Sequence, residues 1–400
     1  MKILQLCHKP PKPTIDGGCI AMNNITQGLL NAGHNLKILT IGTHKHPFQP
    51  ESLSSEYKKK TRIESVFVDT RINLVDAFSN LVTSDSYNIS RFFSTDFDIL
   101  LTKTLEEEKF DIIHLESLFM TPYLHTVRRL SRAKVVLRSH NLEYMIWKRM
   151  AVGTTNPAKR IYLNILANQL KTYEENILKD IDAIAAISAE DTKRYANMNI
   201  KKPLISLPFG IDINNYNPTE KTPTSTIKFF HIGAMDWKPN IEGVSWFLEE
   251  IWPAMLKENP NIELHLAGRN MPNWMDNLNQ KGVFIHGEVS DAKTFMNKYD
   301  IMIVPILSAG GMRVKIIEGM AMKKAIISTQ IGAEGIEYKN GTHILIADTV
   351  EEFVSTLKNI ESHPNRINNM GENARELVID KYDNAALTLK LISFYESLQK

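Results

Sequence analysis

Short apolar segments alternate along the chain with longer stretches whose apolar residues recur at helical spacing. In the first half this pattern predicts buried strands at residues 2–8, 37–42, 110–118, 133–144 and 181–188. Polar residues follow each of these segments, and helical stretches separate them. An alternation of strand and helix is typical of a parallel, doubly wound α/β sheet with helices on both faces.

The second half repeats the same alternation. Six further strands are predicted, at residues 227–235, 262–269, 283–289, 300–306, 325–332 and 343–347. A helix over residues 240–259 is predicted after the first of these strands. Residues 214–225, rich in Asn, Pro and Thr, lie between the two arrays and predict a hinge. The sequence therefore predicts two domains, 1–213 and 226–383, followed by an amphipathic helix over 384–400.

Composition limits the function classes. A chain of 400 residues with 43% hydrophobic and 23% charged residues is typical of a soluble protein with two cores. A formal net charge of +2 gives no indication of a nucleic-acid partner. Two cysteines fit a reducing cytoplasm rather than a disulfide or structural zinc framework. No leader is recognised, and no apolar run approaches the ~20 residues that span a membrane.

A glycine turn in the second half carries the most specific chemistry. Residues 300–307 predict a buried strand, 308–311 a small-residue turn, and 312–322 a helix with Arg313 and Lys315 in its first turn. Two cations are unfavourable at a helix N-terminus unless an anion binds there. With Glu318 one turn further in, the pattern predicts a site for a diphosphate attached to a sugar. The competing interpretation makes Arg313 and Lys315 solvated surface residues, one of them paired with Glu318.

Polar residues also follow the strands of the first half. Gly17 and Gly18 stand at the entry to a helix, and His114 and His140 are placed at or after strand ends, which in a parallel sheet meet at one edge. Neither G-x-G-x-x-G nor a phosphate-binding G-x-x-x-x-G-K motif occurs in the sequence, so dinucleotide binding and ATP hydrolysis lose their main support.

Residues 145–180 predict a long helical region with mixed basic and apolar residues, including Lys148, Arg149, Lys159 and Arg160. Such a helix lies on an anionic membrane surface, or else packs one face on the core and exposes the other. Both interpretations stay open from the sequence.

The turn at residues 310–318, GGMRVKIIE, resembles the donor site of retaining glycosyltransferases of family 4, in the bacterial surface-polysaccharide subgroup with the pattern GG-x-R-x-K-x-x-E. Glu318 falls on the second glutamate of the family's usual pair, and Gly310 stands where the first would be. SHNLE at 139–143 resembles the family's H-N-x-E stretch, whose histidine, here His140, lies by the transferred sugar. HGEVSD at 286–291 resembles the loop that receives the nucleotide base, which implicates Gly287 and Val289.

The resemblance implies the GT-B fold: two facing Rossmann-like domains with a cleft between them, and residues 384–400 packed back on the first domain. It implies transfer of a hexose from UDP-sugar or GDP-sugar to a hydroxyl of a glycan or lipid-linked acceptor, with retention of configuration, in surface polysaccharide or glycan assembly. The backbone at Gly310, Gly311 and Met312 would bind the diphosphate, beside Arg313 and Lys315. His140, Arg313, Lys315 and Glu318 would be catalytic, and Gly17 and Gly18 would approach the donor.

A helix end with two cations can take the place of a metal ion, so metal-independent catalysis in the cytoplasm, with a peripheral position at the inner face of the membrane, is expected. Two alternatives remain open: a nucleotide-sugar epimerase of the same architecture, and a non-catalytic carbohydrate-binding protein.

Overall fold

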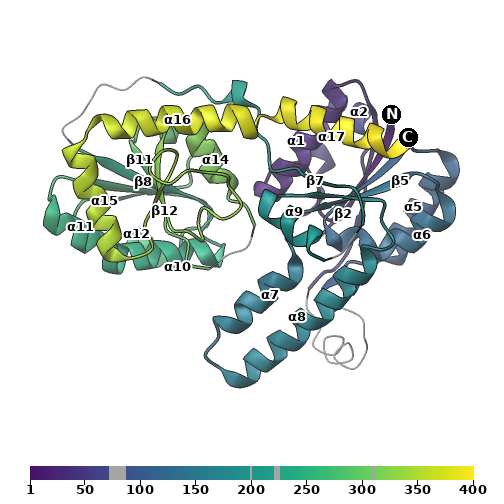
Figure 1. Cartoon of the computed structure of the whole chain (residues 1–400), viewed down its shortest axis with the longest axis horizontal. Helices are drawn as coiled ribbons and strands as arrows, with labels where there is room; N and C mark the ends of the chain where they lie inside the picture. Colours follow the sequence, from purple (N-terminus) through teal and green to yellow (C-terminus); the bar gives the residue numbers. More distant parts are fainter. Residues whose placement is uncertain (72–86, 199–200, 220–225, 309–310) are drawn as a thin grey trace. The chain divides into compact units, whose positions relative to one another are not determined.

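The chain divides into two compact units, each built on one parallel sheet. Unit 1 comprises Met1–Gly210 with Asn384–Lys400, and unit 2 comprises Ile211–Asp383. The structure, a computed structural model, describes residues 1–71, 87–198, 201–219, 226–308 and 311–400 (Figure 1). No helix among the described residues is both long and apolar enough to cross a membrane.

Unit 1 contains a seven-stranded sheet in the order β3-β2-β1-β4-β5-β6-β7, with every pair parallel. The strands are β1 Lys2–Cys7, β2 Asn35–Gly42, β3 Glu64–Phe67, β4 Ile112–Glu116, β5 Lys134–Ser139, β6 Ala183–Ala186 and β7 Leu204–Ser206. The α-helices are α1 Gly17–Asn31, α2 Ser55–Thr61, α4 Tyr87–Ser90, α5 Thr95–Glu107, α6 Leu124–Leu130, α7 Glu143–Val152, α8 Pro157–Ile177, α9 Ala189–Ala196 and α17 Asn384–Gln399. Short 3-10 turns occur at Pro50–Ser52 and Leu118–Tyr123.

Unit 2 contains a six-stranded sheet in the order β10-β9-β8-β11-β12-β13, again all parallel. The strands are β8 Lys228–Ile232, β9 Glu263–Ala267, β10 Val283–Gly287, β11 Ile301–Val304, β12 Ala325–Ser328 and β13 Leu345–Ile346. The α-helices are α10 Lys238–Trp246, α11 Trp252–Glu258, α12 Asn273–Asp276, α13 Ala292–Asn297, α14 Val314–Ala321, α15 Val350–Ser362 and α16 Asn365–Lys381. A 3-10 turn at Ile213–Asn215 precedes β8, and a π-helical turn at Phe247–Ile251 joins α10 to α11. The two doubly wound parallel sheets confirm the predicted fold class.

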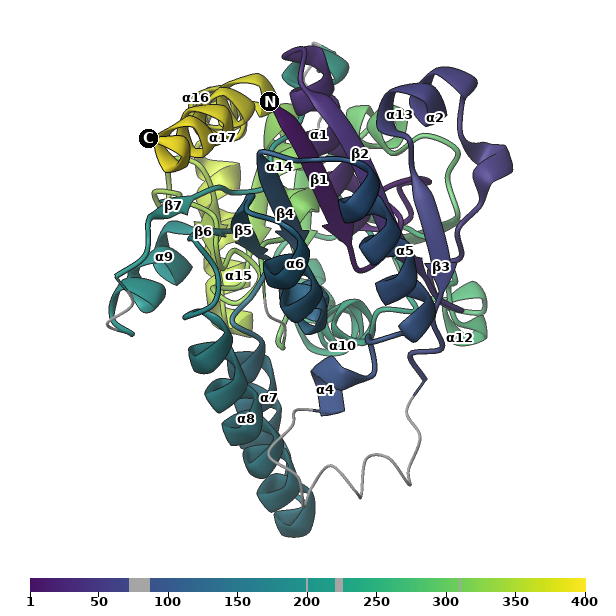
Figure 2. The same cartoon turned by 90° about the vertical axis from the view of Figure 1, so that its right-hand side faces the viewer.

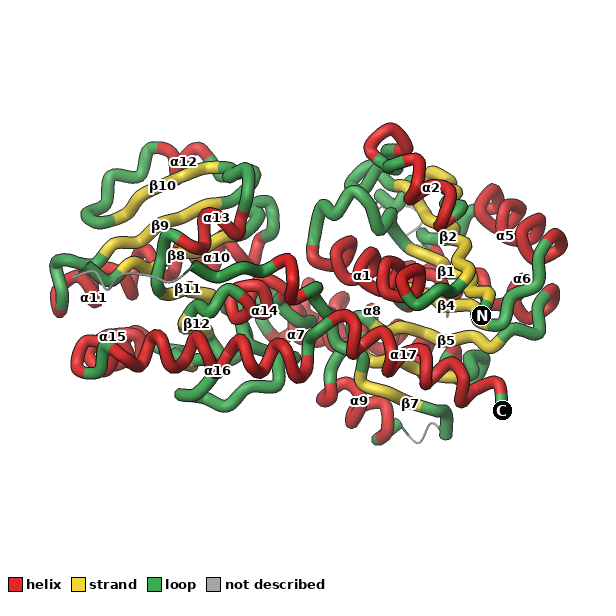
Figure 3. The backbone as a smooth tube through the Cα atoms, turned by 90° about the horizontal axis from the view of Figure 1, so that it is seen from above, coloured by secondary structure: helices red, strands yellow, loops and turns green. Residues whose placement is uncertain are grey.

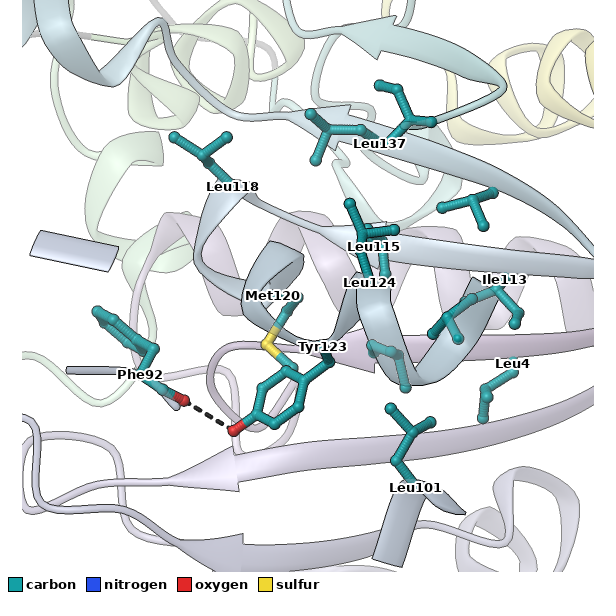
Figure 4. Close-up of a cluster of buried hydrophobic side chains, with 14 of the residues drawn as sticks. Leu4, Phe92, Leu101, Ile113, Leu115, Leu118, Met120, Tyr123, Leu124 and Leu137 are labelled. Carbon is teal, nitrogen blue, oxygen red and sulfur yellow. Dashed lines mark hydrogen bonds between the residues drawn. The ribbon is translucent and has the colours of Figure 1, made fainter. Parts of the chain in front are cut away.

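Helices lie on both sides of each sheet (Figure 3), and central strands such as β4 and β11 are buried along their whole length, as their continuous apolar sequences predicted. In unit 1 the even residues Leu4 and Leu6 of β1 pack with α5 and α6, whereas the odd residues Ile3 and Cys7 pack with α1 and α17. On the first face, the hydroxyl of buried Tyr123 donates a hydrogen bond to the Phe92 carbonyl oxygen at 2.8 Å (Figure 4). Helix α17 packs so closely on α1 that a Cβ atom at Gly28 would lie 2.0 Å from Thr388 Oγ1.

Both sheets reverse their strand order beside the first strand of the unit. The reversal lies between β1 and β4 in unit 1 and between β8 and β11 in unit 2. In open parallel sheets, ligands bind outside the carboxyl ends of the strands at this switch point. The topology therefore selects two places to look for functional side chains.

Three predicted elements differ from the structure. Residues 64–67 form β3, which the sequence did not indicate because this short edge strand is only partly buried. The helical region predicted over 145–180 is two helices, α7 and α8, because Gly153 ends the first and Pro157 begins the second. The helix predicted from residue 312 begins at Val314, so the prediction that Arg313 lies in its first turn is wrong.

Two buried carboxyl groups hold the base of the α7 and α8 pair. Glu174 accepts hydrogen bonds from the backbone N–H groups of Glu143, at 2.8 Å, and Tyr144, at 3.4 Å, and so caps the first turn of α7. Burial raises the pKa of Glu143 to about 7. Burial, together with the negative charge of Glu143, raises the pKa of Glu174 to about 8.

We expect unit 1 to lose stability as the pH rises from about 4.5 to 8. The folded state holds protons on Glu143 and Glu174 that the unfolded chain releases near pH 4.3, so the free energy of unfolding falls across this window. Glu174→Gln should flatten the fall in melting temperature between pH 5.5 and 8.5, measured by calorimetry. Glu175→Gln, an exposed neighbour paired with Lys171, is the control. An unchanged pH dependence in Glu174→Gln would contradict the assignment.

Candidate active site

The carboxyl ends of β1, β4 and β5 bring polar side chains together in unit 1. Glu116 pairs in register with Cys7 on β1 and Arg138 on β5, and His114 pairs with Gln5. Since side chains alternate between the two faces of a strand, these residues share the face that α1 and α17 cover. A buried polar cluster results in the middle of an apolar sheet.

Glu116 is the centre of this cluster. It is fully buried, and its Oε1 accepts hydrogen bonds from Gln5 Nε2 at 3.0 Å and His114 Nε2 at 3.1 Å. Its Oε2 accepts from His140 Nε2 at 2.8 Å and from Arg138 Nη1 at 3.4 Å. Burial alone would raise the pKa of Glu116, but Arg138 and His114 outweigh it and hold the pKa well below the ordinary value. The group is therefore a carboxylate.

The ionised carboxylate fixes the tautomer of His140. A carboxylate only accepts hydrogen bonds, so the proton of neutral His140 must be on Nε2. Burial lowers the pKa of His140, partly offset by Glu116, so the imidazole is neutral. Its Nδ1 is then a hydrogen-bond acceptor with no partner among the described residues. The His8 and Phe209 rings pack edge-on against it, with centroids at 5.7 Å in each case.

His114, the other histidine noted in the sequence, has both nitrogens occupied. Its Nδ1 accepts a short hydrogen bond from the hydroxyl group of Tyr395 on α17. Its Nε2 donates a hydrogen bond to Glu116. It is fully buried and therefore supports the sheet and α17.

Arg138 is the cation opposite Glu116. It is fully buried, stacks over the Phe209 ring at 5.2 Å, and has no hydrogen-bond partner in the described part of the chain for Nε or Nη2. Removing its carboxylate partner would leave this charge buried without compensation.

The glycines Gly17 and Gly18 start α1, as predicted. A Cβ atom at Gly18 would lie 2.7 Å from Lys9 Nζ, so the glycine makes room for this lysine. Lys9 Nζ pairs with both oxygens of Asp16, at 2.8 and 2.7 Å, and His46 Nε2 lies 2.9 Å from Asp16 Oδ2. Among the described residues, Asp16, Cys19 and His46 have ligand atoms close enough to one another to bind a metal ion. The Lys9 ammonium group, however, already pairs with the Asp16 carboxylate and supplies the positive charge at this position.

In unit 2 the first strand separates from its neighbour at the switch point. The register of β8 and β11 ends at Phe230 and Met302, after which His231 donates its Nδ1 hydrogen to the Ile303 carbonyl oxygen at 2.9 Å. Beyond the strand, Gly233 approaches Gly268 so closely that a Cβ atom at Gly268 would lie 1.8 Å from the Gly233 oxygen. A side-chain hydrogen bond therefore joins β8 to β11 beyond the last residues of their backbone register.

Lys315 of α14 reaches the carboxyl end of β8. Its Nζ donates to Asn240 Oδ1 at 2.7 Å and lies 3.4 Å from both Ile232 O and His231 Nε2. All three acceptors are neutral. Burial and the nearby Arg313 charge lower the pKa of Lys315 to about 7, against the opposing effect of Glu318.

Glu318 contacts the start of unit 2. Its Oε1 accepts a hydrogen bond from the Tyr216 hydroxyl at 2.8 Å, and Lys293 Nζ stacks over the Tyr216 ring at 4.9 Å. Burial raises the pKa of Glu318, while Tyr216, Lys293 and Lys315 counteract it. Tyr216 is in turn fixed by Arg375, which donates to its carbonyl oxygen at 2.8 Å.

Arg313 is the residue preceding α14 and is almost fully buried. Its Nε donates to Gly332 O at 3.0 Å and its Nη2 to Ile331 O at 2.6 Å, with Glu334 Oε2 at 3.7 Å. The guanidinium therefore joins the N-terminal end of α14 to the loop after β12. Direct diphosphate binding by Arg313 stays a prediction.

The remaining predicted site residues lie around the same edge of unit 2. Gly311 has φ of +77°, which favours glycine, and buried Met312 follows it. Gly287, with φ of +64°, ends β10, and Val289 follows in the next loop. Gly310 lies outside the described residues. The predicted site residues are thus divided between the two units, with Gly17, Gly18 and His140 in unit 1 and the others in unit 2.

Sequence reasoning missed Glu116, His231, Asn240 and Tyr216 as site residues. One signal was available: His114 and Glu116 are two polar residues at a spacing of two within an apolar strand, which places both on one buried face. Asn240 and Tyr216 carry no comparable signal, since each reaches its partner only in the folded unit.

Two family models match the chain. One, described as "Glycosyltransferase Family 4", covers residues 16–215, and the other, "Glycosyl transferases group 1", covers residues 226–363. The chain belongs to the glycosyltransferases. A curated relative of this glycosyltransferase is an "Uncharacterized 44.6 kDa protein in cps region" of Klebsiella pneumoniae, 23% identical over 96% of this chain and 97% of that protein.

Solved structures share the fold of this glycosyltransferase. Sucrose-phosphate synthase from Thermosynechococcus elongatus matches with a TM-score of 0.71 at 15% identity, over 100% of this chain and 99% of that chain. HepE of Anabaena, solved in complex with UDP, matches with a TM-score of 0.66 at 13% identity, over 99% and 100% of the two chains. HepE has also been solved with UDP-glucose. The two units of the glycosyltransferase therefore have the architecture of GT-B enzymes.

Proposed function

We propose that this glycosyltransferase transfers a hexose from UDP-sugar or GDP-sugar to a hydroxyl group of a glycan or lipid-linked acceptor, with retention of the anomeric configuration. The observation that carries the proposal is the environment of Lys315. Its ammonium group lies at the carboxyl end of β8 and contacts only neutral acceptors among the described residues. A partly buried ammonium group whose direct hydrogen-bond partners are all neutral is poorly compensated, and a diphosphate would supply negative charge in contact with it.

The surroundings of Lys315 support the same ligand. Arg313, the N-cap residue of α14, makes no side-chain capping hydrogen bond in the described part of the chain, and the N-terminus of this helix adds a favourable potential for an anion. As the bond between sugar and diphosphate breaks, negative charge develops on the leaving group. Lys315 and the helix N-terminus stabilise that charge where it forms, which is electrostatic catalysis that requires no metal ion.

Two further side chains recognise hydroxyl groups in this proposal. Glu318 uses Oε1 for Tyr216, and its second oxygen accepts from a ribose or sugar hydroxyl of the donor. His140 offers Nδ1 as an acceptor to the transferred sugar, with Glu116 holding the ring. Retention is inferred from the likeness of SHNLE and GGMRVKIIE to the motifs of retaining enzymes.

The relatives support a biological setting for this proposal. The Klebsiella pneumoniae relative belongs to a cps region, and HepE binds UDP and UDP-glucose, so we assign this chain to surface polysaccharide or glycan assembly with a nucleotide-sugar donor. A lipid-linked acceptor would place it at the inner face of the membrane.

A nucleotide-sugar screen tests the function. A donor at 100 times its dissociation constant adds about 2.7 kcal/mol to the stability of the protein, which a thermal melt detects. The donor found in this way should release its nucleoside diphosphate, and NMR of the glycosylated product should show the anomeric configuration of the donor. An isomeric nucleotide sugar would instead identify an epimerase. Absence of both stabilisation and turnover across UDP-sugars and GDP-sugars would refute the proposal.

A further inference from the structure

Helices α7 and α8 carry an unusual distribution of charge. Residues 144–173 include five basic residues and no Asp or Glu, whereas the whole chain has 47 basic and 45 acidic residues. The basic residues are Lys148, Arg149, Lys159, Arg160 and Lys171. A segment of this length with only one sign of charge attracts an anionic surface.

The same helices expose apolar side chains near the turn that joins them. On α8, Leu163, Leu166, Ala167 and Leu170 are buried, whereas the rest of its first half is largely exposed. Five large apolar residues in this region are exposed to between 38% and 76%: Met150, Val152, Ile161, Tyr162 and Ile165. Figures 1 and 2 show α7 and α8 as a helical pair that extends away from the sheet of its own unit. The exposed apolar residues are therefore at the end that projects from unit 1.

We propose that residues 148–165, termed here the hairpin tip, dock on an anionic lipid surface. Val152 and Ile161 would enter the boundary between headgroups and acyl chains, while Lys148 and Lys159 would contact lipid phosphates. Apolar insertion combined with basic residues is how helices bind at the surface of a membrane without spanning it. The inference deepens the proposed function, and rests on it only for the lipid-linked acceptor.

Charge decides between a lipid surface and a second copy of this chain. Two hairpin tips packed together would bring Lys148, Lys159 and Arg160 of each copy close to the same residues of the other. No carboxylate within residues 144–173 is available to compensate them. Like charges at an interface are unfavourable, whereas an anionic bilayer provides a continuous layer of counter-charge.

The base of the same helices adjoins the active site. Helix α7 begins at Glu143, three residues after His140, and Glu174 of α8 binds the first two N–H groups of α7. A docked tip would thus hold the His140 segment at a defined distance from the membrane, where a lipid-linked acceptor presents its hydroxyl group.

Vesicle sedimentation of the full chain tests the proposal. The protein should sediment with vesicles of phosphatidylcholine and phosphatidylglycerol, much less with phosphatidylcholine alone, and less as salt rises. Lys159→Gln with Arg160→Gln should weaken binding by roughly 5-fold per cation, and Val152→Ser with Ile161→Ser should weaken it at least as much. UDP or GDP binding, measured on the same variants, should not change.

Matched controls make the result specific. Ile379→Ser with Leu389→Ser removes two apolar side chains of similar exposure on α16 and α17, and Lys58→Gln with Lys59→Gln removes two exposed cations on α2. These variants should sediment like the unmodified protein. Equal losses in the control variants, no sedimentation at low salt, or a dimer that Val152→Ser with Ile161→Ser converts to a monomer would each overturn the proposal. Sedimentation without any nucleotide binding would retain it and reject the donor site instead.

Discussion

Lys315→Met is expected to weaken binding of UDP or GDP by roughly 10- to 150-fold, because a hydrogen bond to a charged group contributes ~1.5 to 3 kcal/mol. Methionine keeps most of the length of the side chain and removes only the ammonium group. Binding of the bare nucleoside should hardly change, since the lysine acts on the phosphates. Calorimetry with nucleoside, monophosphate and diphosphate measures the three affinities directly.

The lowered pKa adds a second signature for Lys315. With a pKa of about 7 the amine is largely neutral at pH 8 in the unliganded protein, and a bound diphosphate favours its protonated form. Binding at pH 8 should therefore take up nearly one proton, and the affinity should fall as the pH rises above 7. Titrations in two buffers with different ionisation enthalpies give the number of protons.

Two comparisons make the Lys315 result decisive. Lys257→Met, an exposed lysine on α11 of the same unit, should leave both affinity and proton uptake unchanged. In Lys315→Met the proton uptake should disappear. An equal loss of affinity for nucleoside, monophosphate and diphosphate would mean a damaged unit 2, and the assignment of Lys315 to the diphosphate would be wrong.

Glu116→Gln is expected to destabilise unit 1 by roughly 3–5 kcal/mol, because breaking a buried ion pair leaves the partner charge uncompensated. That charge is Arg138, which is fully buried. With the amide nitrogen in the place of Oε2, the substituted side chain presents N–H groups to His140 Nε2, and the ring has to place its proton on Nδ1. In that orientation His140 donates at the position where the proposed sugar hydroxyl needs an acceptor.

Activity measurements separate the positioning role of Glu116 from its structural role. Release of nucleoside diphosphate from the donor should slow at a temperature where Glu116→Gln is fully folded, while binding of the free diphosphate by unit 2 should be retained. If Glu116 acts through His140, adding Glu116→Gln to His140→Ala should change the rate very little. Glu190→Gln, which removes an exposed carboxylate paired with Arg194, is the control and should change stability by less than about 1 kcal/mol. Additive rate losses in the double variant would contradict the positioning role.

Arg313 and Lys315, the two cations predicted to bind the diphosphate, have different surroundings in the structure. Arg313 and Lys315 are equivalent in the sequence pattern, since both stand near the start of one helix. In the folded unit Arg313 donates to the carbonyl oxygens of Ile331 and Gly332, and Lys315 has only neutral acceptors. Lys315 is therefore the stronger candidate for the diphosphate.

The amino-acid sequence by itself determined the layered architecture of this protein. Strands whose residues are all apolar, such as residues 301–304, bury both faces in a parallel sheet that is covered by helices on each side. This pattern can be recognised in the sequence without knowledge of any tertiary contact. The short edge strand β3 was missed because a partly buried strand lacks a strong pattern.

Tertiary structure alone decided which polar residues meet. Glu116 joins Gln5 and His140 because strands distant in sequence lie in adjacent register, and Tyr216 reaches Glu318 across 102 positions of the chain. Protonation is decided at the same level, since the lowered pKa of Lys315 arises from burial and from neighbouring charges that only the folded chain supplies. Hydrophobic periodicity specifies elements because it acts between near neighbours, whereas the partner and charge of a side chain depend on contacts that sequence spacing does not encode.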